Sequence, residues 1–176
     1  MLIFKDEAVP LATLLLAFVQ VKRSTERELV RLARQHPDFA IFDSLPGAGE
    51  FLAPALLAKF GDDRARFPSP ASVQALAGTC PVTDQSGKRR RIYFRQACDR
   101  EFRYIAQTFA VTSVNQAAWA VAYWQQLRAR GIATHQAYRC LANRWLAIVW
   151  KLWQTRQPYD AAYHLQQRAL RSKPKA

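Results

Sequence analysis

Ser86 is the residue whose type and neighbours most directly suggest chemistry. It precedes Gly87, and a run of basic residues follows the pair. A serine hydroxyl before a glycine is sterically open, and nearby cations stabilise the negative charge that develops on a phosphoryl group. Ser86 is therefore a candidate nucleophile toward a phosphate ester. The alternative is an ordinary turn, because Ser-Gly pairs are common in turns.

Basic and aromatic residues are interleaved on both sides of position 95. The segment 84–104 holds seven Lys or Arg residues against three Asp or Glu residues. The basic residues are Lys88, Arg89, Arg90, Arg91, Arg95, Arg100 and Arg103. Cationic segments with aromatic side chains between the charges suit a groove that follows a nucleic-acid backbone, so we predict that these residues bind DNA. The alternative is a charged face that only meets solvent.

A second candidate phosphate site is the segment 45–49, Leu-Pro-Gly-Ala-Gly. Pro46 disfavours a helical conformation at the residue before it, and Gly47 and Gly49 permit positive φ, so the chain can reverse here. Apolar residues then recur at helical spacing. The pattern predicts a helix-hairpin-helix motif over about 40–60, in which the amides of Gly47 and Gly49 hold a phosphate oxygen and read no bases. An ordinary interhelical turn is the alternative.

The elements that position these residues are predicted to be mostly α. Helical periodicity returns after residue 99 and continues through residues 116–130 and 134–155. The segment 79–95, which carries Ser86, is the least helical part and is predicted to be a loop. We therefore expect a compact helical domain over residues 37–160, followed by a basic tail at 161–176.

Residues 1–36 are predicted to form a coiled-coil-like helix. The positions that step alternately by four and three are Leu11, Leu15, Phe18, Lys22, Thr25, Leu29 and Leu32. This is a heptad seam, which predicts self-association. Two alternatives remain: one amphipathic helix that lies on the same domain, or a new helix that starts at a capping box formed by Thr25 and Glu28.

Composition favours a nucleic-acid partner. The 176 residues carry a formal net charge of +13, which points to a polyanion, with an acidic membrane surface as the competing partner. Three widely spaced cysteines (Cys80, Cys98 and Cys140) match neither a disulfide framework nor a zinc site. The apolar run 10–21 is too short to span a bilayer. We expect a cytoplasmic protein with no membrane partner and no metal ligands.

The order of several motifs resembles the C-terminal half of one transposase family. The motifs are Leu-Pro-Gly-Ala-Gly at 45–49, Gly-Asp at 61–62, Leu-Ala-Gly at 76–78, Gln-Ser-Gly-Lys-Arg-Arg at 85–90 and the ending 141–160. The family is the DEDD/serine transposases of insertion sequences, also known as bridge-RNA-guided recombinases. The resemblance implies DNA as substrate and, by position, Ser86 as the nucleophile that becomes linked to it. The further partners it implies are a guide (bridge) RNA, a second copy of the chain and a full-length transposase.

Members of the family also have an N-terminal RuvC-like domain, which holds Mg²⁺ on four acidic residues. The motifs that carry the resemblance do not include this domain. Asp6, Glu7, Glu26 and Glu28 lie on short helical stretches and cannot replace such a cluster. We therefore expect no cofactor in this chain, and Mg²⁺ only with the missing domain.

The predicted function is that of the DNA-binding, serine-bearing domain of a truncated transposase that acts in transposition and recombination. Two alternatives remain. The first is a non-catalytic helix-hairpin-helix module that binds nucleic acid, and the second is a coiled-coil interaction protein.

Overall fold

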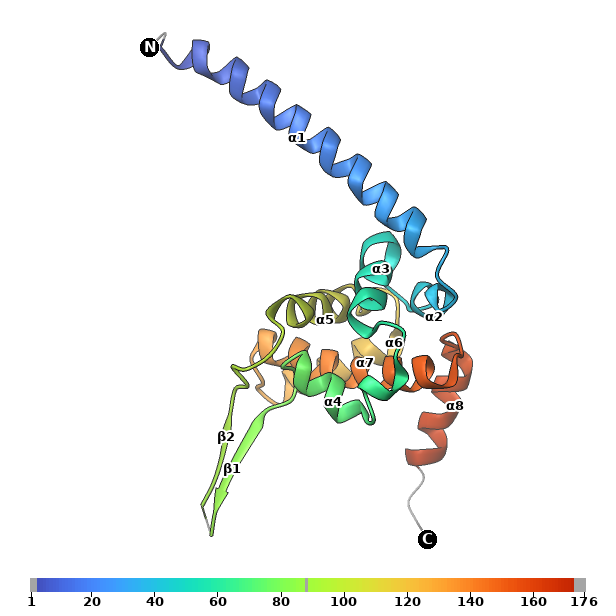
Figure 1. Ribbon diagram of the computed structural model, residues 1–176. Coiled ribbons are helices and arrows are strands. Elements are labelled where there is room, and N and C mark those ends of the chain that lie inside the picture. Colours follow the sequence, from blue (N-terminus) through green and yellow to red (C-terminus); the bar gives the residue numbers. More distant parts are fainter. Residues whose placement is uncertain (1–2, 88, 173–176) are drawn as a thin grey trace. The chain divides into compact units, whose positions relative to one another are not determined.

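The computed structural model describes residues 3–87 and 89–172, and the chain divides into two units, Met1–Pro37 and Asp38–Ala176. The first unit is one helix, α1 (Ile3–Ala33). The second unit contains the other helices and one small sheet (Figure 1). The prediction of a mostly α fold is confirmed.

Helix α1 runs without a break through Thr25, so the alternative of a new helix that starts there is wrong. The Thr25 hydroxyl donates to the carbonyl of Val21 inside the helix, at 3.0 Å, instead of capping a helix start. The apolar members of the heptad seam are exposed, among them Leu15 and Phe18, at 63% and 68%. Self-association through this seam stays a prediction.

The second unit begins with two helices joined by a short turn, as the sequence predicts. Helix α2 (Phe39–Asp43) ends before Pro46, and α3 (Gly49–Phe60) ends at Gly61. Phe42, Leu56 and Phe60 are fully buried, and the rings of Phe42 and Phe60 have centroids 5.4 Å apart. The apolar spacing in the sequence therefore marks the packed face of α3.

Helix α7 (Thr134–Thr155) is the longest helix of the second unit. The other helices after α3 are η1 (Arg64–Arg66), α4 (Pro70–Leu76), α5 (Arg100–Ser113), α6 (Ala118–Ala129) and α8 (Ala161–Ser172). Helix α7 packs against α4, α5 and α6, and α3 packs against α5 (Figure 1). The segment predicted as a basic tail, 161–176, is helical over residues 161–172, and its last four residues lie outside the described residues.

Aromatic side chains fill the core along α7. Phe60 meets the rings of Phe102 and Trp153 edge-on, with centroids 6.0 and 5.4 Å away. Toward the other end, Trp145 lies 5.0 Å from the Phe109 ring and donates its indole N–H to the buried Ser113 hydroxyl at 2.8 Å. Buried aromatic pairs add specific edge contacts to the burial of their area, which fixes α5 on α7.

The predicted loop at 79–95 is wrong in detail, because most of it is a β-hairpin. Strands β1 (Val82–Ser86) and β2 (Arg89–Tyr93) pair antiparallel and project from the helical unit (Figure 1). Every residue of β1 is exposed, so the strand has none of the apolar alternation that marks a half-buried strand. Within the described residues, no helix is both long and apolar enough to cross a bilayer.

Candidate nucleic-acid interface

The β-hairpin places Ser86 at its tip, on one face with two arginines. Ser86 pairs with Arg89, and Asp84 pairs with Arg91. Directly opposed residues, and residues two apart along a strand, share one face of a sheet. Ser86, Arg89 and Arg91 therefore lie together on what we call the serine face, with Asp84 and Tyr93. Arg91 donates a 3.3 Å hydrogen bond to the Tyr93 hydroxyl.

The serine face is open to solvent. All described side chains of the hairpin are exposed, and a Cβ added at Gly87, where φ is 56°, would meet no atom within 4 Å. The hydroxyl of Ser86 can thus approach a large ligand such as a duplex, with cations beside it to neutralise phosphate charge. Lys88 lies outside the described residues. Arg90 pairs with Gln85 in β2, and its side chain is not described.

The residues around Ser86 do not form a metal site. In the described part of the chain, no group of three or more His, Cys, Asp or Glu side chains is placed to hold a metal ion. The acid nearest Ser86 on its own strand, Asp84, stands opposite Arg91. These residues do not fit a Mg²⁺ ion, and we assign no metal-dependent step to them.

The root of the hairpin is fixed by cations that stack on one ring. The guanidinium carbons of Arg103, from α5, and Arg139, from α7, lie 4.3 and 4.2 Å from the centroid of Phe94. Arg103 also donates to the carbonyl of Arg95 and to the Cys98 sulfur. We call Phe94, Arg95, Arg103 and Arg139 the Phe94 cluster. It joins the hairpin to two helices of the second unit.

Gly78 leaves the space that Arg103 occupies. It follows α4 with φ 62°, and a Cβ there would lie 2.6 Å from an Arg103 guanidinium nitrogen and 2.8 Å from the Cys98 sulfur. Any larger residue would push this part of the Phe94 cluster aside. The Leu-Ala-Gly motif at 76–78 therefore serves the hairpin root.

The glycine turn, residues 44–48, is packed more tightly than the sequence predicts. The Gly47 amide donates to Gln116 Oε1 at 2.9 Å, inside the chain. A Cβ on Gly47 would lie 2.8 Å from backbone atoms of Thr112 and Ser113 at the end of α5. Gly47 is thus required for close approach of two backbones, and its amide is already engaged.

Gly49 is the glycine that stays accessible. It is exposed, has φ 56°, and a Cβ there would meet nothing within 4 Å. It is also the first residue of α3, where backbone N–H groups have no carbonyl four residues earlier to bond. The phosphate-binding prediction for the segment 45–49 therefore depends on Gly49, which directly follows the glycine turn.

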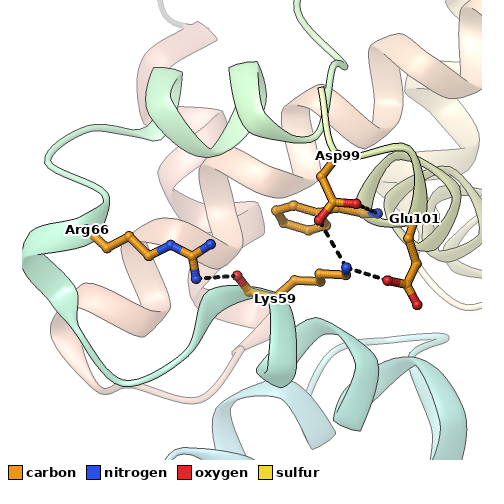
Figure 2. A network of polar contacts seen from close by, with 5 residues as sticks. Lys59, Arg66, Asp99 and Glu101 are labelled. Atoms are coloured by element: carbon orange, nitrogen blue, oxygen red, sulfur yellow. Dashed lines mark hydrogen bonds and ion pairs between the residues drawn. The ribbon is translucent and has the colours of Figure 1, made fainter. Parts of the chain in front are cut away.

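A lysine connects α3 to the start of α5 (Figure 2). Lys59 Nζ lies 2.6 Å from Glu101 Oε2 and 3.0 Å from Asp99 Oδ2, while Asp99 Oδ1 accepts the Phe102 amide at 2.9 Å. Hydrogen bonds from the Phe102 amide and Lys59 lower the pKa of Asp99, and those to Glu101 and Asp99 raise the pKa of Lys59. Asp99 thus caps α5 as a carboxylate. Arg66 donates to the Lys59 carbonyl on the other side.

The glycine turn and the hairpin meet α5 at opposite ends. Gly47 packs on Thr112 and Ser113, whereas Arg103 belongs to the hairpin root. Thr112 follows Arg103 by nine positions of helix, about 14 Å along the axis. The predicted cations are thus brought together only in part: Arg95 and Arg103 join the root, Arg89 and Arg91 lie on the serine face, and Arg100 is exposed on the first turn of α5.

Sequence reasoning missed Arg139 and Gln116. Arg139 lies far from Phe94 in the sequence and comes from a segment that shows only helical periodicity. Gln116 lies far from Gly47 and comes from a connection between two helices. No local pattern signals that α7 passes beside β2, or that Gln116 reaches the glycine turn. These contacts become visible only once the helices are packed.

Residues 40–125 match the family model described as Transposase IS116/IS110/IS902 family. The matched range includes the glycine turn, the hairpin and α5. The chain contains a Transposase IS116/IS110/IS902 family domain. Arg139 lies outside the range of this transposase-family match.

Relatives of the transposase-family domain have names that agree with the match. A Streptomyces coelicolor protein, named as a mini-circle transposase for IS117, is 32% identical over 72% of this chain and 31% of its own length. The insertion element IS116 protein of Streptomyces clavuligerus is 27% identical over 86% of this chain and 38% of its own. An IS900 protein of Mycobacterium paratuberculosis is 30% identical over 73% and 33%. The chain thus spans about a third of the length of these relatives.

Proposed function

We propose that this chain is the DNA-binding, serine-bearing domain of an insertion-sequence transposase, with Ser86 as the nucleophile. The observation that carries the proposal is the serine face. Ser86 lies at an exposed hairpin tip with Arg89 and Arg91 on the same face, inside the residues that match the transposase family. An open hydroxyl beside two cations suits attack on a phosphodiester held outside the protein.

The proposed step exchanges one phosphoester bond for another. Ser86 Oγ forms a bond to phosphorus while the bond from phosphorus to one sugar oxygen breaks. The proton of the serine ends on the released sugar hydroxyl, so the step is balanced without an oxidant or reductant. Arg89 and Arg91 would neutralise charge on the phosphoryl oxygens.

Another part of the system must accept the proton first. Asp84, the nearest acid on β1, stands opposite Arg91, and the described residues offer no metal cluster. We therefore propose that this domain acts together with a RuvC-like domain, supplied by a partner or by another part of the protein. The exposed apolar positions of α1, such as Leu15 and Phe18, support association through that helix.

The test is a covalent adduct. The chain is mixed with a RuvC-like domain of a relative, Mg²⁺ and DNA that carries the element ends, and the products are run under denaturing conditions. We expect a protein–DNA adduct that is lost in Ser86→Ala, while DNA affinity stays within about twofold, because one neutral hydroxyl adds little to a backbone-driven interface.

Thr83→Ala is the matched control, since Thr83 is an exposed hydroxyl on the same hairpin that pairs with Ile92. We expect it to keep the adduct. An adduct that survives Ser86→Ala would move the nucleophile to another residue. Salt-dependent binding with no adduct in any mixture would favour the non-catalytic nucleic-acid-binding module.

A further inference from the structure

Three arginines from three parts of the fold converge on the root of the hairpin. Arg95 follows β2, Arg103 comes from α5 and Arg139 from α7. Arg103 and Arg139 stack on the single ring of Phe94, at 4.3 and 4.2 Å. Two cations on one ring lie closer together than the Debye length, which is about 10 Å at 0.1 M salt. Dissolved ions therefore do not screen the repulsion between the two guanidinium groups.

In the described part of the chain, no carboxylate forms an ion pair with any of these three arginines. The acids nearest in sequence, Asp99 and Glu101, bind Lys59 instead (Figure 2). The Nε atoms of Arg95, Arg103 and Arg139 are buried, and none has an acceptor among the described residues. An aromatic ring attracts a cation but supplies no strong acceptor, so these donors stay unsatisfied.

Burial and a neighbouring cation both disfavour the charged form of Arg139. Burial lowers the pKa of Arg139 most, and the charge of Arg103 lowers it further. The adjacent Cys140 does not provide the missing charge, because burial raises the pKa of its thiol. An anion at this place would offset both the repulsion between the arginines and the loss of water around them.

We propose that the Phe94 cluster binds a backbone phosphate of a nucleic acid, with Arg139 as a contact residue contributed by α7. Guanidinium groups match the oxygens of a phosphate with paired N–H donors, and stacking on Phe94 fixes their planes before the ligand arrives. The inference rests on the proposed function, because it extends the same interface from the serine face to the hairpin root.

The geometry sets the spacing of the two contacts. Five residues lead from Arg89, opposite Ser86, to Phe94, which is about 17 Å of extended strand. The phosphate at the root would therefore lie about 17 Å from the one at Ser86. The hairpin would then lie along the backbone and contact it at both ends.

The first experiment measures the salt dependence of binding by the full chain. Binding to a 20-base-pair duplex and to a 20-nucleotide RNA is followed over a salt series for the parent, Arg139→Gln and Arg144→Gln. Arg144 is the matched control, because it lies on the same helix and also stacks on a ring, that of Tyr123, at 4.8 Å. We expect Arg139→Gln to reduce the slope of log affinity against log salt by about 0.9 for duplex DNA and about 0.7 for RNA, with about tenfold weaker binding.

The outcomes separate the ligand sources and the alternatives. A reduced slope with DNA or RNA, and a parent-like slope for Arg144→Gln, supports the site and says which nucleic acid occupies it. An unchanged slope for Arg139→Gln overturns the proposal and leaves the Phe94 cluster as an anchor of the hairpin. An equal effect of Arg144→Gln also overturns it, since the effect would then follow net charge alone.

The second experiment uses the unaltered chain, so it does not depend on whether a variant folds. Inorganic phosphate is titrated at constant ionic strength against chloride, and the arginine Nε–H resonances are followed by NMR. We expect the signals of Arg103 and Arg139 to shift with phosphate while that of Arg144 stays. Absence of a shift overturns the site. A shift in a protein that binds neither DNA nor RNA would keep the anion site and reject the proposed function.

Discussion

The glycine turn and the β-hairpin differ in what surrounds their backbones. At the glycine turn, the amide of Gly47 is bonded to Gln116 and its Cα lies against the backbone of α5, so this backbone is already engaged within the fold. The described side chains of the hairpin are exposed, and its root contacts α5 and α7 through Phe94. A glycine motif can thus serve packing, while the charged segment beyond it is left to meet a ligand.

Gly47→Ala is expected to have the largest effect on stability. The new Cβ would lie 2.8 Å from the backbone of Thr112 and Ser113, and the residue would have to keep a φ of +86°. Overpacking against rigid backbone and a left-handed conformation together should lower the free energy of unfolding by about 3 kcal/mol. Urea denaturation measures it. If the free energy of unfolding falls by less than about 1 kcal/mol, Gly47 is not packed closely against the backbone of α5.

Replacing Arg89 and Arg91 together by Gln should weaken DNA binding and leave stability unchanged, in contrast to Gly47→Ala, which should lower stability. Loss of two phosphate contacts should reduce the salt slope by about 1.8, while the free energy of unfolding changes by less than about 0.5 kcal/mol, because both side chains are exposed. Fluorescence anisotropy over a salt series measures the slope. The control is Arg23 and Arg27 to Gln on α1, which removes the same charge; an equal effect there would reject the serine face as the contact.

Asp99→Ala tests the start of α5, the helix that both the glycine turn and the root of the hairpin contact. Loss of the cap on α5 should lower the free energy of unfolding by about 1 kcal/mol, because the Phe102 amide loses its acceptor. The folded pKa of Asp99 is lowered, so its contribution is complete above the ordinary aspartate pKa of about 3.9 and is lost as the pH falls through the lower folded value.

Urea denaturation between pH 2 and pH 7 checks this pH dependence. The difference between the parent and Asp99→Ala should shrink on the acid side only. A difference that stays constant with pH would show that the carboxylate form of Asp99 is not what stabilises α5.

Gly49→Ala should have the smallest effect. A Cβ there meets open space, so only the φ of +56° opposes it, at about 1 kcal/mol of stability. Thermal unfolding beside Gly47→Ala gives the contrast directly. Gly49→Val should in addition weaken DNA binding, because a branched side chain covers the start of α3. Parent-like affinity of Gly49→Val would confine the interface to the hairpin.

The helical part of the fold could be predicted from sequence because its signals are local. Apolar periodicity and the Pro-Gly turn place α2 and α3, and Asp99 begins α5 as its cap. The hairpin could not be predicted, since Val82 to Ser86 is exposed throughout and lacks an apolar face. Ser86 and the cations of β2 were identified by residue type, but the serine face needs the register of the strands.

The Phe94 cluster could not be predicted from the sequence for a different reason. Its arginines lie up to 44 positions apart in the sequence, from Arg95 to Arg139, and only the packing of α5 on α7 brings them to one ring. The engagement of Gly47 by Gln116 depends on packing in the same way. Sequence indicates which groups can bind a phosphate, and tertiary structure decides which of them are still available.

The sheet has only two strands, and this has a consequence for how the molecules behave in concentrated solution. Each strand has an outer edge whose backbone groups can pair with a strand of another molecule, which is how exposed sheets begin to aggregate. Charged residues on an edge strand oppose such pairing, and Arg89 and Arg91 place like charges on β2 of every copy. The same arginines that we propose to meet a phosphate thus keep unliganded hairpins from adhering to one another.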